Sequence, residues 1–198
     1  MQFSFVGPRV DHAAGVVALD FYSERNFLTT HSMFPIIVMG VSGCGKTTVG
    51  RALAERLNAA FLDADDLHPA SNVAKMRVGM PLNDEDRAPW LAALNEELRT
   101  RSDDGEQVVL ACSALKKNYR AAIGAGLSHV QWVFLDGSFE LIAARMRERP
   151  NHYMPTSLLR SQFDALERPE DAITVSIKLS SAEQVEAALY GLQKNSAH

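Results

Sequence analysis

The stretch GVSGCGKTT, residues 40–48, carries residue types that can hold a chain of phosphates. It fits the pattern G-x-x-x-x-G-K-[ST] from Gly40 to Thr47. Its glycines allow the backbone to curl so that N–H groups face phosphate oxygens, and the following helix adds its positive end. Lys46 would reach the β- and γ-phosphates of ATP, and Thr47 would place its hydroxyl on Mg²⁺. The alternative is an ordinary glycine-rich turn. The predicted nucleotide site consists of Gly40, Val41, Ser42, Gly43, Cys44, Gly45, Lys46, Thr47 and Thr48.

Two aspartates with i, i+2 spacing follow the next apolar run. Asp63 and Asp65 stand at the end of the predicted strand AAFLDAD, where side chains two apart share one face. Open parallel sheets bind ligands beyond the carboxyl ends of their strands, so both carboxylates should face the phosphate loop. One would hold Mg²⁺, and the other would accept the proton of an attacking hydroxyl. The alternative is a solvated acidic loop in which Asp65 or Asp66 caps the next helix.

Cationic side chains follow the acidic pair and could bind an acidic substrate. His68 and Lys75 lie on the next segment, and Arg120 follows the third predicted strand in CSALKKNYR. A substrate with its own carboxylate needs cations that do not touch the nucleotide, and arginine binds carboxylates with bidentate geometry. Each of these residues could equally be a surface charge, which is the interpretation we prefer for Lys116 and Lys117.

A second basic segment, RMRERPNHYMP, is interrupted by two prolines and is typical of a mobile flap. Arg145 and Arg149 are four residues apart and should share a helix face. Phosphoryl transfer needs cations that arrive over the triphosphate and leave with the product, so both are candidate catalytic residues. The alternative is a solvated basic helix end, which suits Arg147 better.

Asp136 ends the apolar run VQWVFLD and could be mistaken for the metal-holding carboxylate of a Walker B strand. The run leads directly into the arginine helix through GSFE. We therefore prefer to interpret Asp136 and Ser138 as turn and cap residues.

Short apolar runs alternate with amphipathic segments along the chain, the pattern of βαβ units and a parallel sheet. The sequence thus predicts an α/β fold. Strands are expected at Ile36–Gly40, AAFLDAD, QVVLACSAL, VQWVFLD and AITVSIKL. Helices are expected from about Gly45 to Asn58, Asn72 to Val78, Asp86 to Arg101, and from Ser181, with a capping box to Gln184. Their predicted buried residues are Val49, Leu53, Leu57, Trp90, Leu91, Leu94, Leu98, Val185, Ala188 and Leu189.

Composition limits the function classes. The 198 residues suit about one domain, with 46% hydrophobic and 22% charged residues. A net charge of -4 without a basic stripe argues against nucleic-acid binding. No apolar run approaches the roughly 18 residues needed to span a membrane. Two cysteines suit a reducing, cytoplasmic setting.

The first 32 residues lack a secretory pattern and a sustained helix or strand period. Met33 stands just before the first strand. We expect residues 1–32 to be a disordered tail or an over-long gene start, with a short extra structural element as the alternative, and residues 33–198 to form the working domain.

With these motifs in place, the sequence resembles the gluconokinases, a family of small P-loop kinases, from about Ile36 to Leu192. The strings that carry the resemblance are MGVSGCGKTT, AAFLDADDLHP, NVAKM, PLNDEDRAPWL, CSALKKNYR and SQFDALERP. The phosphate loop is shared by many kinds of protein. The combination of PLNDEDRAPWL with CSALKKNYR is far more selective.

The resemblance implies a phosphotransferase that uses ATP and Mg²⁺ to convert D-gluconate to 6-phospho-D-gluconate, for the pentose phosphate or Entner–Doudoroff routes. It implies a five-stranded parallel sheet flanked by helices, as in nucleoside monophosphate kinases, with a mobile lid and commonly a homodimer. The same resemblance places Asp65 at the substrate hydroxyl and Asp63 on the metal side. It places His68, Lys75 and Arg120 near the sugar acid, and Arg145 and Arg149 in the lid. Pro150-Asn151 stands where relatives often have a more flexible small residue, which leaves the lid's motion in doubt.

Other functions are open. The chain shows no N-K-x-D motif of a switch GTPase, so water is a poor candidate acceptor. A nucleotide acceptor, as in adenylate kinase, is compatible with the fold. Shikimate kinase is the nearest competing small-acid kinase, but its glycine-triplet loop has no counterpart around Gly79. A nucleotide-dependent regulator without turnover is the alternative from another class.

Overall fold

The computed structural model describes residues 34–148 and 156–196, which belong to one compact unit. The predicted tail (residues 1–32), Arg149 and the Pro150-Asn151 pair lie outside the described residues.

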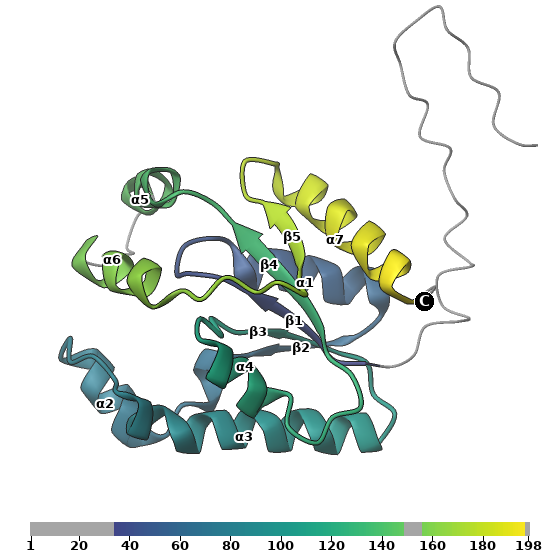
Figure 1. Cartoon of the computed structure of the whole chain (residues 1–198), viewed down its shortest axis with the longest axis horizontal. Helices are drawn as coiled ribbons and strands as arrows, with labels where there is room; N and C mark the ends of the chain where they lie inside the picture. Colours follow the sequence, from purple (N-terminus) through teal and green to yellow (C-terminus); the bar gives the residue numbers. More distant parts are fainter. Residues whose placement is uncertain (1–33, 149–155, 197–198) are drawn as a thin grey trace, which may run out of the picture. The chain divides into compact units, whose positions relative to one another are not determined.

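Five parallel strands form the central sheet in the order β2-β3-β1-β4-β5 (Figure 1). Their bounds are β1 Ile36–Met39, β2 Ala60–Asp63, β3 Val108–Ala111, β4 Gln131–Asp136 and β5 Ile173–Ser176. All residues of β1 and β3 are buried, as expected for parallel strands covered on both faces. The predicted α/β fold with a five-stranded parallel sheet is confirmed.

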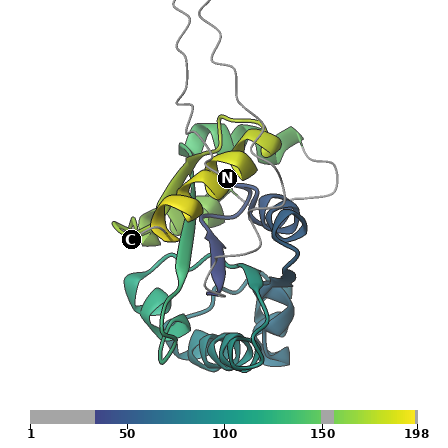
Figure 2. The same cartoon turned by 90° about the vertical axis from the view of Figure 1, so that its right-hand side faces the viewer.

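Helices cover both faces of the sheet. Their bounds are α1 Lys46–Leu57, η1 Ala64–Leu67, α2 Ala70–Arg77, α3 Asp84–Asp103, α4 Lys117–Ile123, α5 Phe139–Glu148, α6 Thr156–Ala165 and α7 Ser181–Ser196. Helices α1 and α7 pack together on one face, and α3 and α4 pack together on the other (Figure 1). Figure 2 shows α7 (yellow) and α3 (teal) on opposite sides of the sheet.

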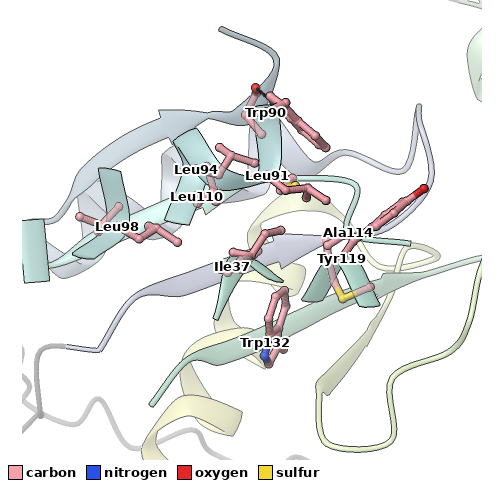
Figure 3. Close-up of a cluster of buried hydrophobic side chains, with 14 of the residues drawn as sticks. Ile37, Trp90, Leu91, Leu94, Leu98, Leu110, Ala114, Tyr119 and Trp132 are labelled. Carbon is pink, nitrogen blue, oxygen red and sulfur yellow. Dashed lines mark hydrogen bonds between the residues drawn. The ribbon is translucent and has the colours of Figure 1, made fainter. Parts of the chain in front are cut away.

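The core on the α3 side is built from the apolar stripe of that helix. Trp90, Leu91, Leu94 and Leu98 are all buried, as their spacing predicts, and they lie against Ile37, Leu110 and Trp132 of the sheet (Figure 3). On the opposite face, Val49 and Leu53 of α1 and Val185, Ala188 and Leu189 of α7 are buried as predicted. Leu57 is only half-buried.

The starts of α2 and α3 differ from the sequence-based expectation; α7 begins at Ser181 as expected, but its capping box differs. Helix α3 begins at Asp84, not Asp86, because Asn83 and Asp86 form a capping box at its N-terminus. The capping box before α7 joins Ser180 to Glu183, so the predicted pairing of Ser181 with Gln184 is wrong.

The strand order sets the position of the functional edge. Neighbouring strands β1 and β4 continue in opposite directions across the sheet, since β1 leads to β2 and β4 leads to β5. Such a topological switch opens a crevice beyond the carboxyl ends of the two strands. The phosphate loop follows β1, and α5 follows β4, so both segments begin at this edge.

Candidate active site

The phosphate loop joins β1 to α1 with the strand–loop–helix context that the motif requires. Gly45 stands before α1 in a left-handed conformation (φ 108°), and no side chain caps the helix, so its first N–H groups are available to an anion. Nζ of Lys46 donates to the carbonyl oxygen of Val41 at 3.2 Å, which folds the ammonium group back over the loop. This arrangement matches the chemistry of a triphosphate site.

A bonded pair of oxygen-bearing side chains lies beside the loop. Thr47 donates from Oγ1 to Oδ2 of Asp63 at 3.0 Å. The other carboxylate oxygen, Oδ1, accepts the backbone N–H of Asp65 at 3.2 Å. The structure thus brings the two predicted metal-side residues together.

Asp65 does not lie on the strand, contrary to the prediction. Strand β2 ends at Asp63, and residues 64–67 form a 3₁₀ turn that Asp63 caps. The two aspartates therefore do not share one face of a strand as their i, i+2 spacing predicts, although both remain at the carboxyl edge of the sheet. The side chain of Asp65 is exposed, and its role at the substrate hydroxyl stays a prediction.

The surroundings of His68 favour the neutral imidazole over the cation. Its imidazole stacks on Trp90 with 4.3 Å between ring centroids and 10° between planes. Burial lowers the pKa of His68 below its ordinary value; the nearby Asp65 opposes this shift, and Arg87 adds to it. The predicted place of His68 near the sugar acid stays a prediction, and burial makes a positive charge on the ring less favourable there.

Asn72 fixes the His68 ring and is a residue that the sequence did not single out. It is almost fully buried, and its Nδ2 donates to the backbone oxygen of Asp86 at 2.8 Å, which sets the orientation of the amide. The same nitrogen lies 3.4 Å from Nδ1 of His68. Because an amide nitrogen only donates, this contact favours the neutral tautomer that has its proton on Nε2.

Lys75 has a carboxylate partner. Its Nζ lies 2.5 Å from Oδ1 of Asp86, and this hydrogen bond holds the pKa of the Asp86 carboxyl below its ordinary value. The pair joins α2 to the start of α3. A substrate carboxylate would therefore meet Lys75 as a member of an ion pair, not as an isolated cation.

The PLNDEDRAPWL segment organises a second polar cluster with α4. Tyr119 and Lys116 both donate to the carboxylate of Asp84, and these hydrogen bonds hold the pKa of Asp84 below its ordinary value, with Tyr119 the larger cause. Arg87 donates to the backbone oxygen of Leu82 at 2.6 Å. The preferred interpretation of Lys116 as a surface charge is incomplete, because its ammonium group forms an ion pair with Asp84 of α3.

Arg120 supports the loop after β3. Its Nη1 donates to the backbone oxygens of Ala114 and Leu115 at 3.0 and 3.2 Å. Ala114 has φ of 42°, a left-handed conformation that residues other than glycine rarely adopt, so these bonds stabilise an unfavourable backbone geometry. A role of Arg120 at the substrate stays a prediction.

Arg145 points toward the segment after β5. Its Nη2 donates to the backbone oxygen of Ile177 at 2.6 Å. A role over the triphosphate stays a prediction for this residue, and its predicted helical partner Arg149 is not described.

Asp136 is the last residue of β4, not a turn residue as predicted, and the preference against a Walker B role stays a prediction. Its Oδ2 lies 2.5 Å from Nη2 of Arg168, and Oγ of Ser138 accepts the N–H of Leu141 in the first turn of α5. These are ion-pair and cap contacts.

One further contact reaches the phosphate loop. Oε1 of Gln162, on α6, accepts the backbone N–H of Ser42 at 2.6 Å. Gln162 stands in the string SQFDALERP, but nothing in the residue types or their spacing links that string to the loop 120 positions earlier.

Together, the sheet order, the loop with its lysine and the Thr47–Asp63 pair define a P-loop kinase. A family model described as shikimate kinase matches residues 42–185. The thermosensitive gluconokinase of Escherichia coli is 46% identical over 166 residues, covering 80% of this chain and 89% of that protein. The chain belongs to the gluconokinase family, within the wider group that the shikimate kinase model describes.

Solved structures agree with this placement. A gluconokinase from Sinorhizobium meliloti is 43% identical, with a TM-score of 0.77, and the match covers 83% of this chain and 94% of that one. Shikimate kinase from Acinetobacter baumannii, in complex with shikimate, is 25% identical, with a TM-score of 0.54 and coverage of 87% and 97%. The family resemblance seen in the sequence is confirmed, and the gluconokinase structure is the better match on both measures.

Proposed function

We propose that the protein transfers the γ-phosphoryl group of ATP to the 6-hydroxyl of D-gluconate, giving 6-phospho-D-gluconate. The observation that carries the proposal is 46% identity to a gluconokinase across 80% of the chain. The proposal is supported by a phosphate loop that has its complete motif at the switch point of the sheet.

The nucleotide would bind through its phosphates. The curled loop offers backbone N–H groups, the uncapped start of α1 adds a partial positive charge, and Lys46 supplies a full one. These groups neutralise charge that spreads over the phosphoryl oxygens in the transition state, which is the main contribution a kinase makes.

Mg²⁺ fits the side chains beside the loop. The Thr47 hydroxyl and the Asp63 carboxylate are oxygen donors 3.0 Å apart, and hard cations such as Mg²⁺ prefer oxygen. These two residues would hold the ion together with phosphate oxygens, and the ion would offset phosphate charge. Metal binding would replace the hydrogen bond that now joins the two side chains.

Asp65 would take the proton of the acceptor hydroxyl. Its side chain is exposed at the carboxyl edge of the sheet, and its backbone N–H is fixed by Asp63. A carboxylate placed there can orient the hydroxyl and accept its proton as the O–P bond forms.

The sugar acid would bind between η1, α2 and the loop after β3. Neutral His68 suits a hydroxyl group, to which Nε2–H donates. Lys75 and Arg120 supply positive charge for the carboxylate, although both already have partners in this structure.

A coupled assay of ADP release tests the proposal. D-gluconate, shikimate, AMP and buffer alone are compared at equal ATP and Mg²⁺, and the product is located by the phosphorus–proton couplings of its NMR spectrum. Turnover that depends on gluconate, with phosphate on carbon 6, is expected. Faster turnover of shikimate or AMP would mean that one of these molecules is the acceptor. ATP binding without turnover of any acid would favour a nucleotide-dependent regulator.

A cytoplasmic location and a homodimer are further parts of the proposal. Among the described residues, no helix is long and apolar enough to cross a membrane. Size-exclusion chromatography with light scattering tests the dimer, and a monomer mass at working concentration would refute it.

A further inference from the structure

Gln162 of α6 is bonded to the phosphate loop itself. Its Oε1 accepts the backbone N–H of Ser42 at 2.6 Å, in partly buried surroundings. A backbone N–H can only donate, so the oxygen end of the carboxamide must face the loop and the NH₂ end must face away from that bond.

Packing holds Gln162 at this place. The neighbouring Phe163 meets Phe139 of α5 edge-on, with 5.6 Å between ring centroids. The guanidinium of Arg160 lies 3.8 Å from the centroid of the same Phe139 ring. Helix α6 is thus fastened to α5 on both sides of Gln162.

Helix α5 in turn lies directly on the loop. A Cβ atom at Gly43 would come within 2.8 Å of Cγ of Met146, and within 3.2 Å of Cγ2 of Ile142. Gly43 also has φ of 82°, which favours glycine. The position of α5, and through it of Gln162, is therefore matched to the curve of the phosphate loop.

An acceptor oxygen on a loop N–H stands where a phosphate oxygen would bind. A charged phosphate oxygen makes a hydrogen bond roughly twice as strong as a neutral amide oxygen does, so ATP can displace Oε1 from Ser42. The displaced carboxamide stays beside the phosphates because α6 is fastened to α5. A half-turn about its last side-chain bond then presents the NH₂ group to a phosphate oxygen.

We propose that Gln162 is a further residue of the phosphate site. It caps the Ser42 N–H while the site lacks nucleotide, and it donates its NH₂ to a phosphate oxygen when ATP is bound. The inference rests on ATP being the phosphate donor, as in the proposed function, but not on which acid accepts the phosphate.

Calorimetric ATP titrations without any acceptor test the inference. Gln162→Glu keeps an oxygen for Ser42 but cannot donate and adds negative charge beside the phosphates, so the Kd for ATP should rise at least tenfold. Gln162→Met keeps the length of the side chain but makes no such bond, and its Kd should rise about three- to tenfold. Ser161→Glu is the matched control, since it adds the same charge at an exposed position on the same helix.

A melting curve without ATP separates binding from folding. Gln162→Glu should melt within about 2 °C of the parent and gain less from ATP. A Kd for ATP that is the same in Gln162→Glu as in Ser161→Glu, or tighter ATP binding by Gln162→Met than by the parent, would overturn the donor role. If the unmodified protein binds ATP but does not phosphorylate gluconate, the proposal that gluconate is the acceptor is refuted, and this inference stands.

Discussion

Thr47 donates a 3.0 Å hydrogen bond to Asp63, and this bond joins the first turn of α1 to the end of β2. The two residues come from segments that β3 separates within the sheet. Asp63 also accepts the backbone N–H of Asp65 through its second oxygen. The carboxylate of Asp63 therefore positions both Thr47, the other proposed metal ligand, and the backbone of Asp65, the proposed base.

This relationship predicts different defects for the two aspartates. Asp65→Asn keeps size and one acceptor oxygen but removes the charge that would take the proton, so kcat should fall about 10²–10⁴-fold. Asp63→Asn should instead require a higher Mg²⁺ concentration for half-maximal rate. Rate measured against Mg²⁺ concentration for both variants checks this. Near-parental kcat in Asp65→Asn, with a shifted Mg²⁺ requirement, would mean that the two roles are reversed.

Lys46→Met should abolish turnover without unfolding the protein. The ammonium group lies over the phosphate loop and is only half-buried, so its loss leaves no cavity in the core. The substitution removes the positive charge of the lysine, which would stabilise the phosphoryl group during its transfer. The measurement is kcat together with a melting curve. A variant that keeps kcat within tenfold of the parent would contradict this role.

Much of the fold could be predicted because its signals are local. Apolar runs marked all five strands, and the spacing of Trp90, Leu91, Leu94 and Leu98 marked the buried face of α3. The errors were local as well. Ser180 and Ser181 are adjacent and both have an acceptor three residues on, so the sequence alone could not decide which one caps α7.

The site was predicted most completely where it lies within one segment. The phosphate loop carries its whole motif in nine residues. By contrast, the ion pair of Lys75 with Asp86 was not predicted, because Asp86 lies across a loop, on another helix. The contact of Gln162 with Ser42 depends on how α6 packs on α5, which no spacing in the sequence reports.

Trp90 links the core to the segment that carries Asp65, and Trp90→Phe should lower both the free energy of unfolding and kcat. Its Nε1 donates to the backbone oxygen of Ala64 at 2.7 Å, directly beside Asp65. Replacement leaves that buried oxygen without its donor, which costs about 1–3 kcal/mol. Urea unfolding measures the loss. Trp132→Phe removes similar volume from the same cluster without touching Ala64, and equal effects on kcat in the two variants would refute a specific link to the site.

His68 should make the protein less stable in mild acid. Its pKa in the folded state lies below the ordinary 6.5, so between those two pKa values the unfolded chain binds more protons. Stability from this residue is full above about pH 6.5 and falls as the pH drops through that window. His68→Gln should therefore lose less free energy of unfolding than the parent between pH 7.5 and 5.5. Denaturant curves at both values test this, and parallel losses in the two proteins would contradict it.

Lys75→Met should weaken gluconate binding while leaving ATP binding unchanged. Lys75 lies on α2, away from the phosphate loop, and Asp86 holds its ammonium group in place. Losing a hydrogen bond to a charged group costs about 1.5–3 kcal/mol, so the KM for gluconate should rise about 10- to 100-fold. Lys117→Met is the matched control, because that side chain is exposed and was predicted to be a surface charge. Initial rates across gluconate concentrations, at saturating ATP, give the KM. A KM within twofold of the parent would remove Lys75 from the acid site, and an equal rise in the KM for ATP would mean that the ion pair with Asp86 only maintains the structure.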